Sequence, residues 1–439
     1  MNATSAHGLE ALLFYTLLQL AVIVLAARAG GALALRWGQS AVVGEIAVGV
    51  LLGPSLFGAL APHAFEAVFG STPAEPLTIL SQVGLLLLMF QIGLEFDFSH
   101  LAQRVHRRVV WTVAGAGLAA PFAIGAALGA VMPREIAGTD NRLGFVLFVA
   151  TAFSITALPV LGRILVDFKM TRSPLGVIAI SCAAINDVIG WLMLAMVSAL
   201  SVSAFSPGPF VLRALGIVAL GVLAWWVLRP LLSRFVRQQM RNARGGSEVG
   251  ALPPTLMGAM LACVFVAGMT TYQLGIFAIF GGFLVGVLLH RETAFARAWH
   301  TRVGTFVNVF FVPIFFTLTG LRTDVGSLHD GPAWGWCMLL IALATLAKLG
   351  ACYVAARWAG LDPVRARIIG MLMNTRGLME LVVINVGLEM GMIGRQVFTM
   401  LVLMALFSTV ITSPALRRWL PLLQPHGEPT PSVALGGRG

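Results

Sequence analysis

Four ionisable side chains lie well inside apolar stretches of the sequence, where a charge is costly. They are Asp187, Lys348, Arg376 and Glu380. A charge at the centre of a lipid bilayer costs at least about 2.5 kcal/mol, so such residues face a wet cavity, hold a proton or pair with one another. A carboxylate that binds either a proton or a small cation has the chemistry that coupled ion exchange requires. Asp187 is therefore the first candidate for an ion-binding residue.

Asp187 has polar neighbours that suit a hard monovalent cation, which takes oxygen ligands. Asn186 precedes it, and Ser154 and Thr156 lie in an earlier apolar stretch beside a proline, where a helix break would open backbone carbonyls. These residues predict a Na+ or K+ site at Asp187. Lys348 is interpreted as a fixed counter-charge or a coupled titrating group. One alternative stays open, in which Lys348 neutralises Asp187 and the pair only ties helices together.

Arg376 and Glu380 are four residues apart and can pair on one helix face. We expect a structural ion pair that braces the surrounding helix. Direct contact of this pair with the transported ion is the less favoured interpretation.

The composition requires a membrane for most of the chain. The 439 residues are 58% hydrophobic and 11% charged, with a mean hydropathy of +0.90, whereas soluble domains have about 25% charged residues. A soluble enzyme, a nucleic-acid-binding protein and a disordered chain are therefore excluded. Thirteen stretches have the length and polarity of a membrane helix: 11–35, 41–59, 75–96, 109–132, 143–165, 173–203, 210–228, 254–272, 275–290, 303–321, 334–358, 365–390 and 396–421.

The basic residues predict the direction of the chain across the membrane. Of 29 basic residues, 21 lie in one set of connections, and the alternate connections hold only Arg134, Arg142, Arg322 and Arg395. Cytoplasmic loops carry the excess of basic residues, so we expect the N-terminus outside and the C-terminus in the cytoplasm. Residues 1–421 are interpreted as one transmembrane domain and 422–439 as a short disordered cytoplasmic tail. The polar stretch 229–253 is expected to be a basic loop.

Two of these stretches contain helix-disrupting residues. One break is predicted at 153–159 in the fifth stretch, and the other at 373–378 in the twelfth. These two stretches run in opposite directions, since the twelfth comes seven crossings after the fifth, an odd number. Paired broken helices in inverted halves are typical of secondary transporters, with the site where they cross. Two ordinary kinked helices are the alternative.

Several long motifs resemble those of a known transporter family. They are Val43–Gly58 (VGEIAVGVLLGPSLFG), Ser154–Leu165 (SITALPVLGRIL), Ala184–Val188 (AINDV), Asn374–Leu381 (NTRGLMEL) and Leu401–Pro414 (LVLMALFSTVITSP). In this order they resemble the monovalent cation:proton antiporter-2 family, in its cation/proton exchanger (Na+/H+ or K+/H+ antiporter) branch. The resemblance covers roughly residues 10–420.

The resemblance implies an all-α polytopic membrane protein with 13 transmembrane helices, inverted repeats and two crossed discontinuous helices. It also implies a homodimer in the cell inner membrane that exchanges Na+ or K+ for H+ by elevator-type alternating access. Asp187 would bind both ions with Asn186 as its partner and Ser154 and Thr156 beside it, and Lys348 matches a basic position of the family.

The chain departs from some members of this family in two ways. Electrogenic relatives carry two aspartates where this chain has Asn186 and Asp187, which favours one proton per cation and electroneutral exchange, although Lys348 could itself titrate. Ligand-gated relatives carry a nucleotide-binding domain, and no such domain, cofactor or nucleic-acid partner is expected here.

Other functions are less consistent with these residues. A Na+-coupled organic-anion symporter of the same architecture would need further sodium ligands and a larger cavity, and it should not need Asn186 and Asp187 together with Lys348. A channel would need a repeated filter of backbone carbonyls. An enzyme is not expected, because no nucleophile–base pair or metal cluster lies at the end of any stretch.

Overall fold

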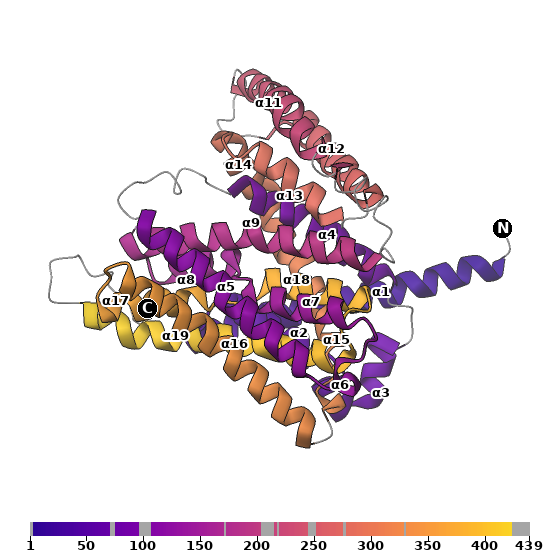
Figure 1. Ribbon diagram of the computed structural model, residues 1–439. Coiled ribbons are helices and arrows are strands. Elements are labelled where there is room, and N and C mark those ends of the chain that lie inside the picture. Colours follow the sequence, from indigo (N-terminus) through magenta and orange to yellow (C-terminus); the bar gives the residue numbers. More distant parts are fainter. Residues whose placement is uncertain are drawn as a thin grey trace, which may run out of the picture. The chain divides into compact units, whose positions relative to one another are not determined.

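The computed structural model describes residues 3–70, 75–95, 107–170, 173–202, 215–216, 219–244, 252–274, 278–328 and 331–423. These segments are helical, with no strand among them (Figure 1). The main helices are α1 (Ala3–Arg36), α2 (Ala41–Leu51), α4 (Glu75–Glu95), α5 (Arg107–Val131), α7 (Arg142–Ser154), α8 (Leu158–Asp167), α9 (Pro174–Val202), α11 (Arg229–Arg244), α12 (Pro254–Gln273), α13 (Ala278–Leu288), α15 (Val312–Leu321), α16 (Gly331–Trp358), α17 (Pro363–Met373), α18 (Leu378–Glu389) and α19 (Arg395–Trp419). Short helices α3 (Pro62–Phe65), α6 (Arg134–Ala137) and α14 (Thr293–Trp299) lie between them.

The helices confirm an all-α polytopic membrane protein. Within the described segments, nine helices are long and apolar enough to cross a membrane, and α2, α7 and α13 are shorter apolar helices. The number of thirteen crossings stays a prediction. Residues 420–423 continue α19 as a 3-10 turn, and the rest of the predicted tail, 424–439, lies outside the described residues.

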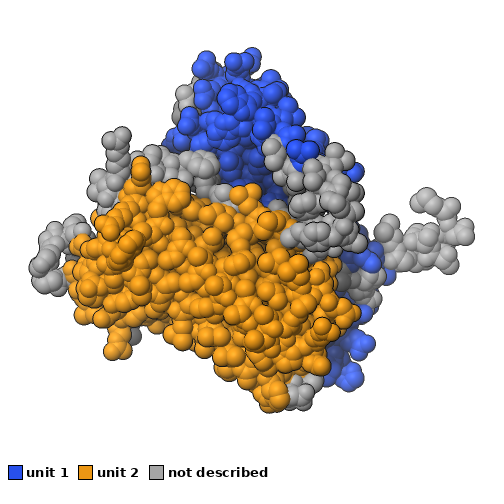
Figure 2. Space-filling model, in the orientation of Figure 1, with its two compact units in different colours: residues 1–27, 49–98, 198–321 blue, residues 28–48, 99–197, 322–439 orange. Residues whose placement is uncertain are grey.

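The chain divides into two compact units (Figure 2). Unit 1 comprises residues 1–27, 49–98 and 198–321, and unit 2 comprises 28–48, 99–197 and 322–439. In unit 1, α4 packs against α13 and α15, and α12 packs against α13. Gly286 permits one of these contacts, because a Cβ there would lie 2.2 Å from the carbonyl oxygen of Phe90. Unit 1 also exposes large apolar side chains, such as Trp226 at 75%, as expected of a surface that faces lipid.

The expected basic loop at 229–253 is wrong for its first part, which is helix α11. Arginine, leucine, glutamine and methionine are good helix formers, and Arg234, Arg237 and Arg241 recur at a spacing that places them on one helix face. The guanidinium of Arg237 pairs with Glu292, with Nε 2.8 Å from Oε1. The low hydrophobicity of this segment concealed its helical periodicity.

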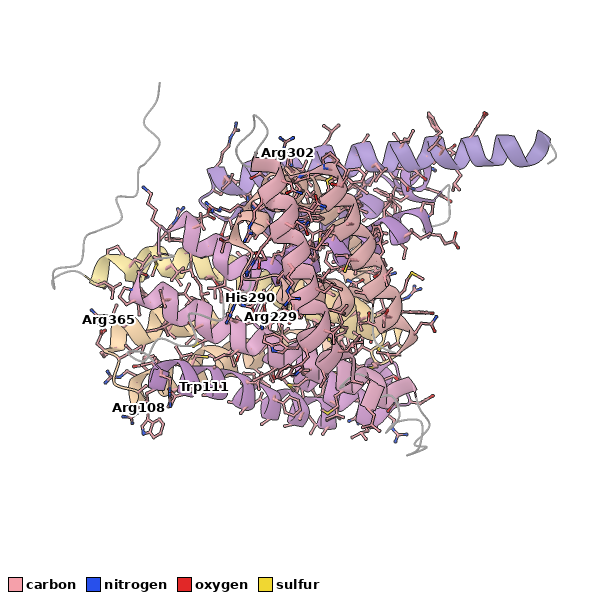
Figure 3. All side chains as sticks on the ribbon, turned by 90° about the horizontal axis from the view of Figure 1, so that it is seen from above. Arg108, Trp111, Arg229, His290, Arg302 and Arg365 are labelled. Atoms are coloured by element: carbon pink, nitrogen blue, oxygen red, sulfur yellow. The ribbon has the colours of Figure 1, made fainter. Side chains whose placement is uncertain are left out.

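In unit 2, α5 lies beside α7 and α16 (Figure 1), and α17, α18 and α19 pack together. The connections between helices that the sequence predicts to be cytoplasmic lie at one end of this unit. The Arg108 guanidinium, near the start of α5, lies 5.3 Å from the ring centroid of Trp358 at the end of α16. Arg365, near the start of α17, lies at the same end (Figure 3).

The few basic residues of the connections predicted to lie outside are found at the opposite end of unit 2. The N–H of Gly394 donates to the carbonyl of Ala137 at 2.8 Å, which joins the start of α19, with Arg395, to α6, which begins at Arg134. Arg322 pairs with Glu389 at the end of α18, at 2.8 Å. Within unit 2, the two sets of connections therefore lie at opposite ends.

Candidate ion-binding site

The first helix break lies where the proline motif predicts it. Helix α7 ends at Ser154 and α8 begins at Leu158, with Pro159 in its first turn. Between them the backbone is extended, with φ −69° and ψ 143° at Ile155. Proline has no N–H to donate to the carbonyl four residues earlier and is tolerated in the first turn of a helix, so a new helix begins here and α7 does not continue into α8.

The second break separates α17, which ends at Met373, from α18, which begins at Leu378. Gly377 has φ +143° and ψ −126°, a conformation that side chains rarely allow. A Cβ at this position would also lie 2.9 Å from Cγ2 of Val160 on α8. Glycine is therefore required both by the backbone of the break and by the close approach of α8.

The two breaks are in direct contact, as the sequence predicts for crossed discontinuous helices. The N–H of Ala157 donates to the carbonyl of Thr375 at 3.1 Å. The hydroxyl of Thr156 donates to the carbonyl of Met373 at 3.3 Å. Residues of one break thus satisfy backbone groups that the other break leaves open.

Two buried cations cap the carboxyl end of α7. The guanidinium of Arg376 donates to the carbonyls of Ala152 at 2.9 Å and Phe153 at 2.8 Å. The ammonium of Lys348 donates to the carbonyl of Ser154 and, at 2.8 Å, to that of Gly117 on α5. The last carbonyls of a helix have no partner within the helix and carry partial negative charge, so these cations stabilise the first break.

The predicted ion pair of Arg376 and Glu380 is present, with 2.8 Å between Nη1 and Oε1 and no exposure of either side chain. Its geometry differs from the prediction, because Arg376 does not lie on a helix. It precedes Gly377 in the break, whereas Glu380 lies in the first turn of α18. A carboxylate is favourable in that position, and Thr409 adds a hydrogen bond to the carbonyl of Arg376.

Asp187 and Asn186 lie within α9, and the side chains of both are buried. Their exposed fractions are 2% and 0%. Among the described residues, neither carboxylate oxygen of Asp187 and neither amide atom of Asn186 has a hydrogen-bond partner. Helix α9 passes close to the first break at this point, because a Cβ built on Gly190, one turn after Asp187, would lie 3.0 Å from Cγ1 of Ile155.

Lys348 does not pair with Asp187 in the part of the chain that the structure describes, since the protein groups at its ammonium are the two carbonyls. The structure therefore gives no support to the alternative in which an ion pair between Asp187 and Lys348 only ties two helices together. Asn186 nevertheless lies near the lysine. A Cβ built on Gly117 would lie 3.7 Å from the amide nitrogen of Asn186, and Gly117 is one of the residues that hold Lys348.

The two predicted hydroxyl ligands are fully buried at the first break. The hydroxyl of Ser154 lies 3.1 Å from the carbonyl of Leu118 and 2.9 Å from that of Ala150, and Thr156 donates to the second break. Each hydroxyl oxygen keeps lone pairs that can accept a hydrogen bond or coordinate a cation.

The prediction from the sequence missed Asn374, the first residue of the second break. Its side chain is completely buried, and its amide oxygen and nitrogen have no partner among the described residues. The signal in the sequence was a polar amide at a predicted helix break. The interpretation of that break considered only the charged pair of Arg376 and Glu380.

Similarity to known proteins extends over nearly the whole chain. Residues 21–421 match the family described as sodium/hydrogen exchanger, transmembrane. The Na+/H+ antiporter NhaS4 of Synechocystis sp. is 36% identical over 406 residues, which cover 92% of this chain and 96% of that protein.

Two longer proteins and one solved structure are also similar. Cation/H+ antiporter 18 of Arabidopsis thaliana is 36% identical over 91% of this chain, and K+/H+ antiporter 1 of Saccharomyces cerevisiae is 31% identical over 86%. The chain spans only 48% and 43% of their respective lengths. The sodium proton antiporter MjNhaP1 of Methanocaldococcus jannaschii has the same fold, with a TM-score of 0.60 at 14% identity over 92% of this chain and 96% of that one.

Proposed function

We propose that this chain, which belongs to the family of transmembrane sodium/hydrogen exchangers, exchanges a monovalent cation, Na+ or K+, for H+ across the membrane. The observation that carries the proposal is the buried carboxylate of Asp187, which has no hydrogen-bond partner among the described residues and lies beside a break in a helix. The names of the similar proteins, Na+/H+, K+/H+ and cation/H+ antiporters, support antiport over the organic-anion symporter.

In this proposal Asp187 binds the proton and the cation in turn. A charged carboxylate removed from water costs several kcal/mol when nothing compensates it, and either a proton or a bound cation neutralises it. The two ligands exclude each other because they need the same oxygens. A site that is stable only when occupied couples the outward movement of one ion to the inward movement of the other.

The remaining oxygen ligands come from groups close to Asp187. Asn186 offers an amide oxygen with no other partner, and Ser154 and Thr156 offer hydroxyl oxygens from the first break. Oxygen donors of this kind suit hard cations and do not themselves distinguish Na+ from K+. None of the three changes its charge, so Asp187 alone carries the exchanged proton.

The other buried charges have a different role. Arg376, Glu380 and Lys348 hold the crossing together, and their charges stay with the protein throughout the cycle. One proton then replaces one cation, and exchange is electroneutral.

We further propose elevator-type alternating access in a homodimer. Every proposed site residue belongs to unit 2, so one compact body would carry the ion while the other remains in place. The distribution of arginines favours an N-terminus outside and a C-terminus in the cytoplasm, and the family resemblance of the sequence motifs favours the cell inner membrane.

Reconstitution of the full chain into proteoliposomes tests this function. With a pH-sensitive dye inside the vesicles, addition of NaCl or KCl should move protons against the cation, and choline chloride should have no effect. Absence of cation-dependent proton movement would reject the antiporter. Na+-dependent accumulation of an organic anion without proton movement would favour the symporter instead.

A further inference from the structure

The four residues of the second break use their side chains in different ways. The hydroxyl of Thr375 donates to the carbonyl of Leu372 at 2.8 Å, Arg376 caps α7, and Gly377 has no side chain. Asn374 is the exception, because its amide is fully buried and neither its oxygen nor its nitrogen is bonded to a described residue. A buried polar group without a partner is uncommon and calls for a physical explanation.

The backbone does not explain why this residue is asparagine. Asparagine is favoured at helix ends where the chain turns into the left-handed region, but Asn374 has φ −82° and ψ −2°. Most residues adopt this conformation, and many would fill the space without burying an unbonded amide. An interaction of the side chain must therefore offset the free-energy cost of burying the unbonded amide.

The position of Asn374 points to that purpose. The residue before it, Met373, accepts a hydrogen bond from Thr156. The residue after it, Thr375, accepts one from Ala157. Asn374 is thus held between two contacts with the first break. Helix α9 passes the same break next to Asp187, because a Cβ on Gly190 would lie 3.0 Å from Cγ1 of Ile155.

We propose that the amide oxygen of Asn374 is a ligand of the transported monovalent cation, contributed by the second broken helix. This inference rests on the proposed function and extends it, because all the ligands proposed above come from the first break and from α9. An amide oxygen is neutral and takes no proton, so it contributes to cation affinity without changing the number of protons exchanged.

Transport by Asn374→Ala in proteoliposomes provides the main test. The apparent KM for Na+ or K+ should rise about tenfold or more, as for the loss of one hydrogen-bond-strength contact to a charged group, with a limiting rate close to that of the wild type. In detergent, the increase in Tm that the cation produces should shrink. An unchanged apparent KM together with an unchanged cation-dependent Tm increase would overturn the proposal.

Asn385→Ala is the matched control. Asn385 is also a buried asparagine, but its amide donates to the carbonyl of Leu381 at 2.9 Å and accepts from Arg322 at 3.0 Å. Its loss should lower Tm without changing the cation-dependent increase. If both variants lose stability alike and neither changes cation affinity, Asn374 has a structural role and the inference is wrong.

The isosteric variant Asn374→Asp provides a second test in case the alanine variant does not fold. A carboxylate beside the cation adds a negative charge, so apparent cation affinity should rise. The same carboxylate can take a second proton on the return step, so two protons would exchange for one cation and exchange should become sensitive to an imposed potential. A variant with wild-type affinity and wild-type voltage response would contradict the proposal. Failure of the wild type to move protons would reject the antiporter itself, whereas loss of the Asn374 effects alone would reject only this extension.

Discussion

Two polar groups of residues lie at the same crossing of broken helices and differ in what they contact. The group of Arg376, Glu380 and Lys348 is fully buried, and it bonds to backbone carbonyls of α5 and α7 or forms an ion pair. Asn186 and Asp187 are buried to almost the same degree without a hydrogen bond from a described residue. Burial alone therefore does not distinguish the two groups. Their partners do, because each charged side chain of the first group has at least one, although Nε of Arg376 and Oε2 of Glu380 have none among the described residues.

The difference has an energetic reason. A buried ion pair or a capped helix end is stable as folded, and it gains nothing from a mobile ligand. A buried carboxylate without a partner is stable only when a proton or a cation neutralises it. Substitutions in each group test whether this difference holds.

The largest effect is expected for Asp187→Asn. An amide cannot bind and release a proton, so cation-dependent proton movement should be lost, because Asp187 is the only proton carrier in the proposed exchange. The protein should still fold, because the side chain keeps its shape. Flux assays on reconstituted protein check the loss, and size-exclusion chromatography checks the fold.

Asn141→Asp makes the reverse exchange of amide and carboxylate away from the proposed site and serves as a control. Asn141 caps the start of α7, where its side-chain oxygen accepts from the N–H of Gly144 at 2.9 Å, and aspartate serves equally well. Exchange should persist in this variant. Substantial proton movement in purified Asp187→Asn would remove Asp187 from the site.

Arg376→Ala and Glu380→Ala should mainly lower stability. Each leaves its partner as an unpaired buried charge, which costs about 3–5 kcal/mol, and the arginine variant also uncaps two carbonyls of α7. Thermal unfolding in detergent should show a large fall in Tm, with a smaller change in the apparent KM for the cation. Wild-type melting combined with lost ion binding would instead place this pair among the functional charges.

Lys348→Gln should have a smaller effect on stability. Glutamine can keep one of the two hydrogen bonds to Ser154 and Gly117, so the loss is about 1–3 kcal/mol. Because the lysine charge is assigned to the protein scaffold, exchange in the wild type and in the variant should respond weakly to voltage. One net charge moved across the membrane is worth about 2.3 kcal/mol per 100 mV.

Vesicle exchange measured with and without an imposed potential checks this point. A strong voltage response in the wild type would reject electroneutral exchange. Its disappearance in Lys348→Gln would identify the lysine as the second titrating group, whereas its persistence would show that another group carries the charge.

The sequence predicted the helices and both breaks because these features depend on local properties. Long apolar stretches, Pro159 and Gly377 suffice to place them. The spacing of Arg376 and Glu380 likewise predicted their ion pair.

The contacts of the buried cations could not be predicted in the same way. Lys348 lies 231 residues from the carbonyl of Gly117 that it caps, and only the packing of α16 against α5 brings them together. Asn374 was missed for a related reason, since a sequence does not show that an amide lacks a partner. Helix α11 was missed because its arginines obscure the apolar side of the helix.

The central claim is that proton and cation compete for Asp187, and the pH dependence of the apparent KM tests it most directly. Protonation removes the vacant carboxylate, so cation affinity should weaken as the pH falls. Below the midpoint of this titration the apparent KM should rise about tenfold per pH unit, as one proton per site requires, while the limiting rate at saturating cation stays constant. An apparent KM that does not change with pH, with only the limiting rate affected, would contradict a shared site at Asp187.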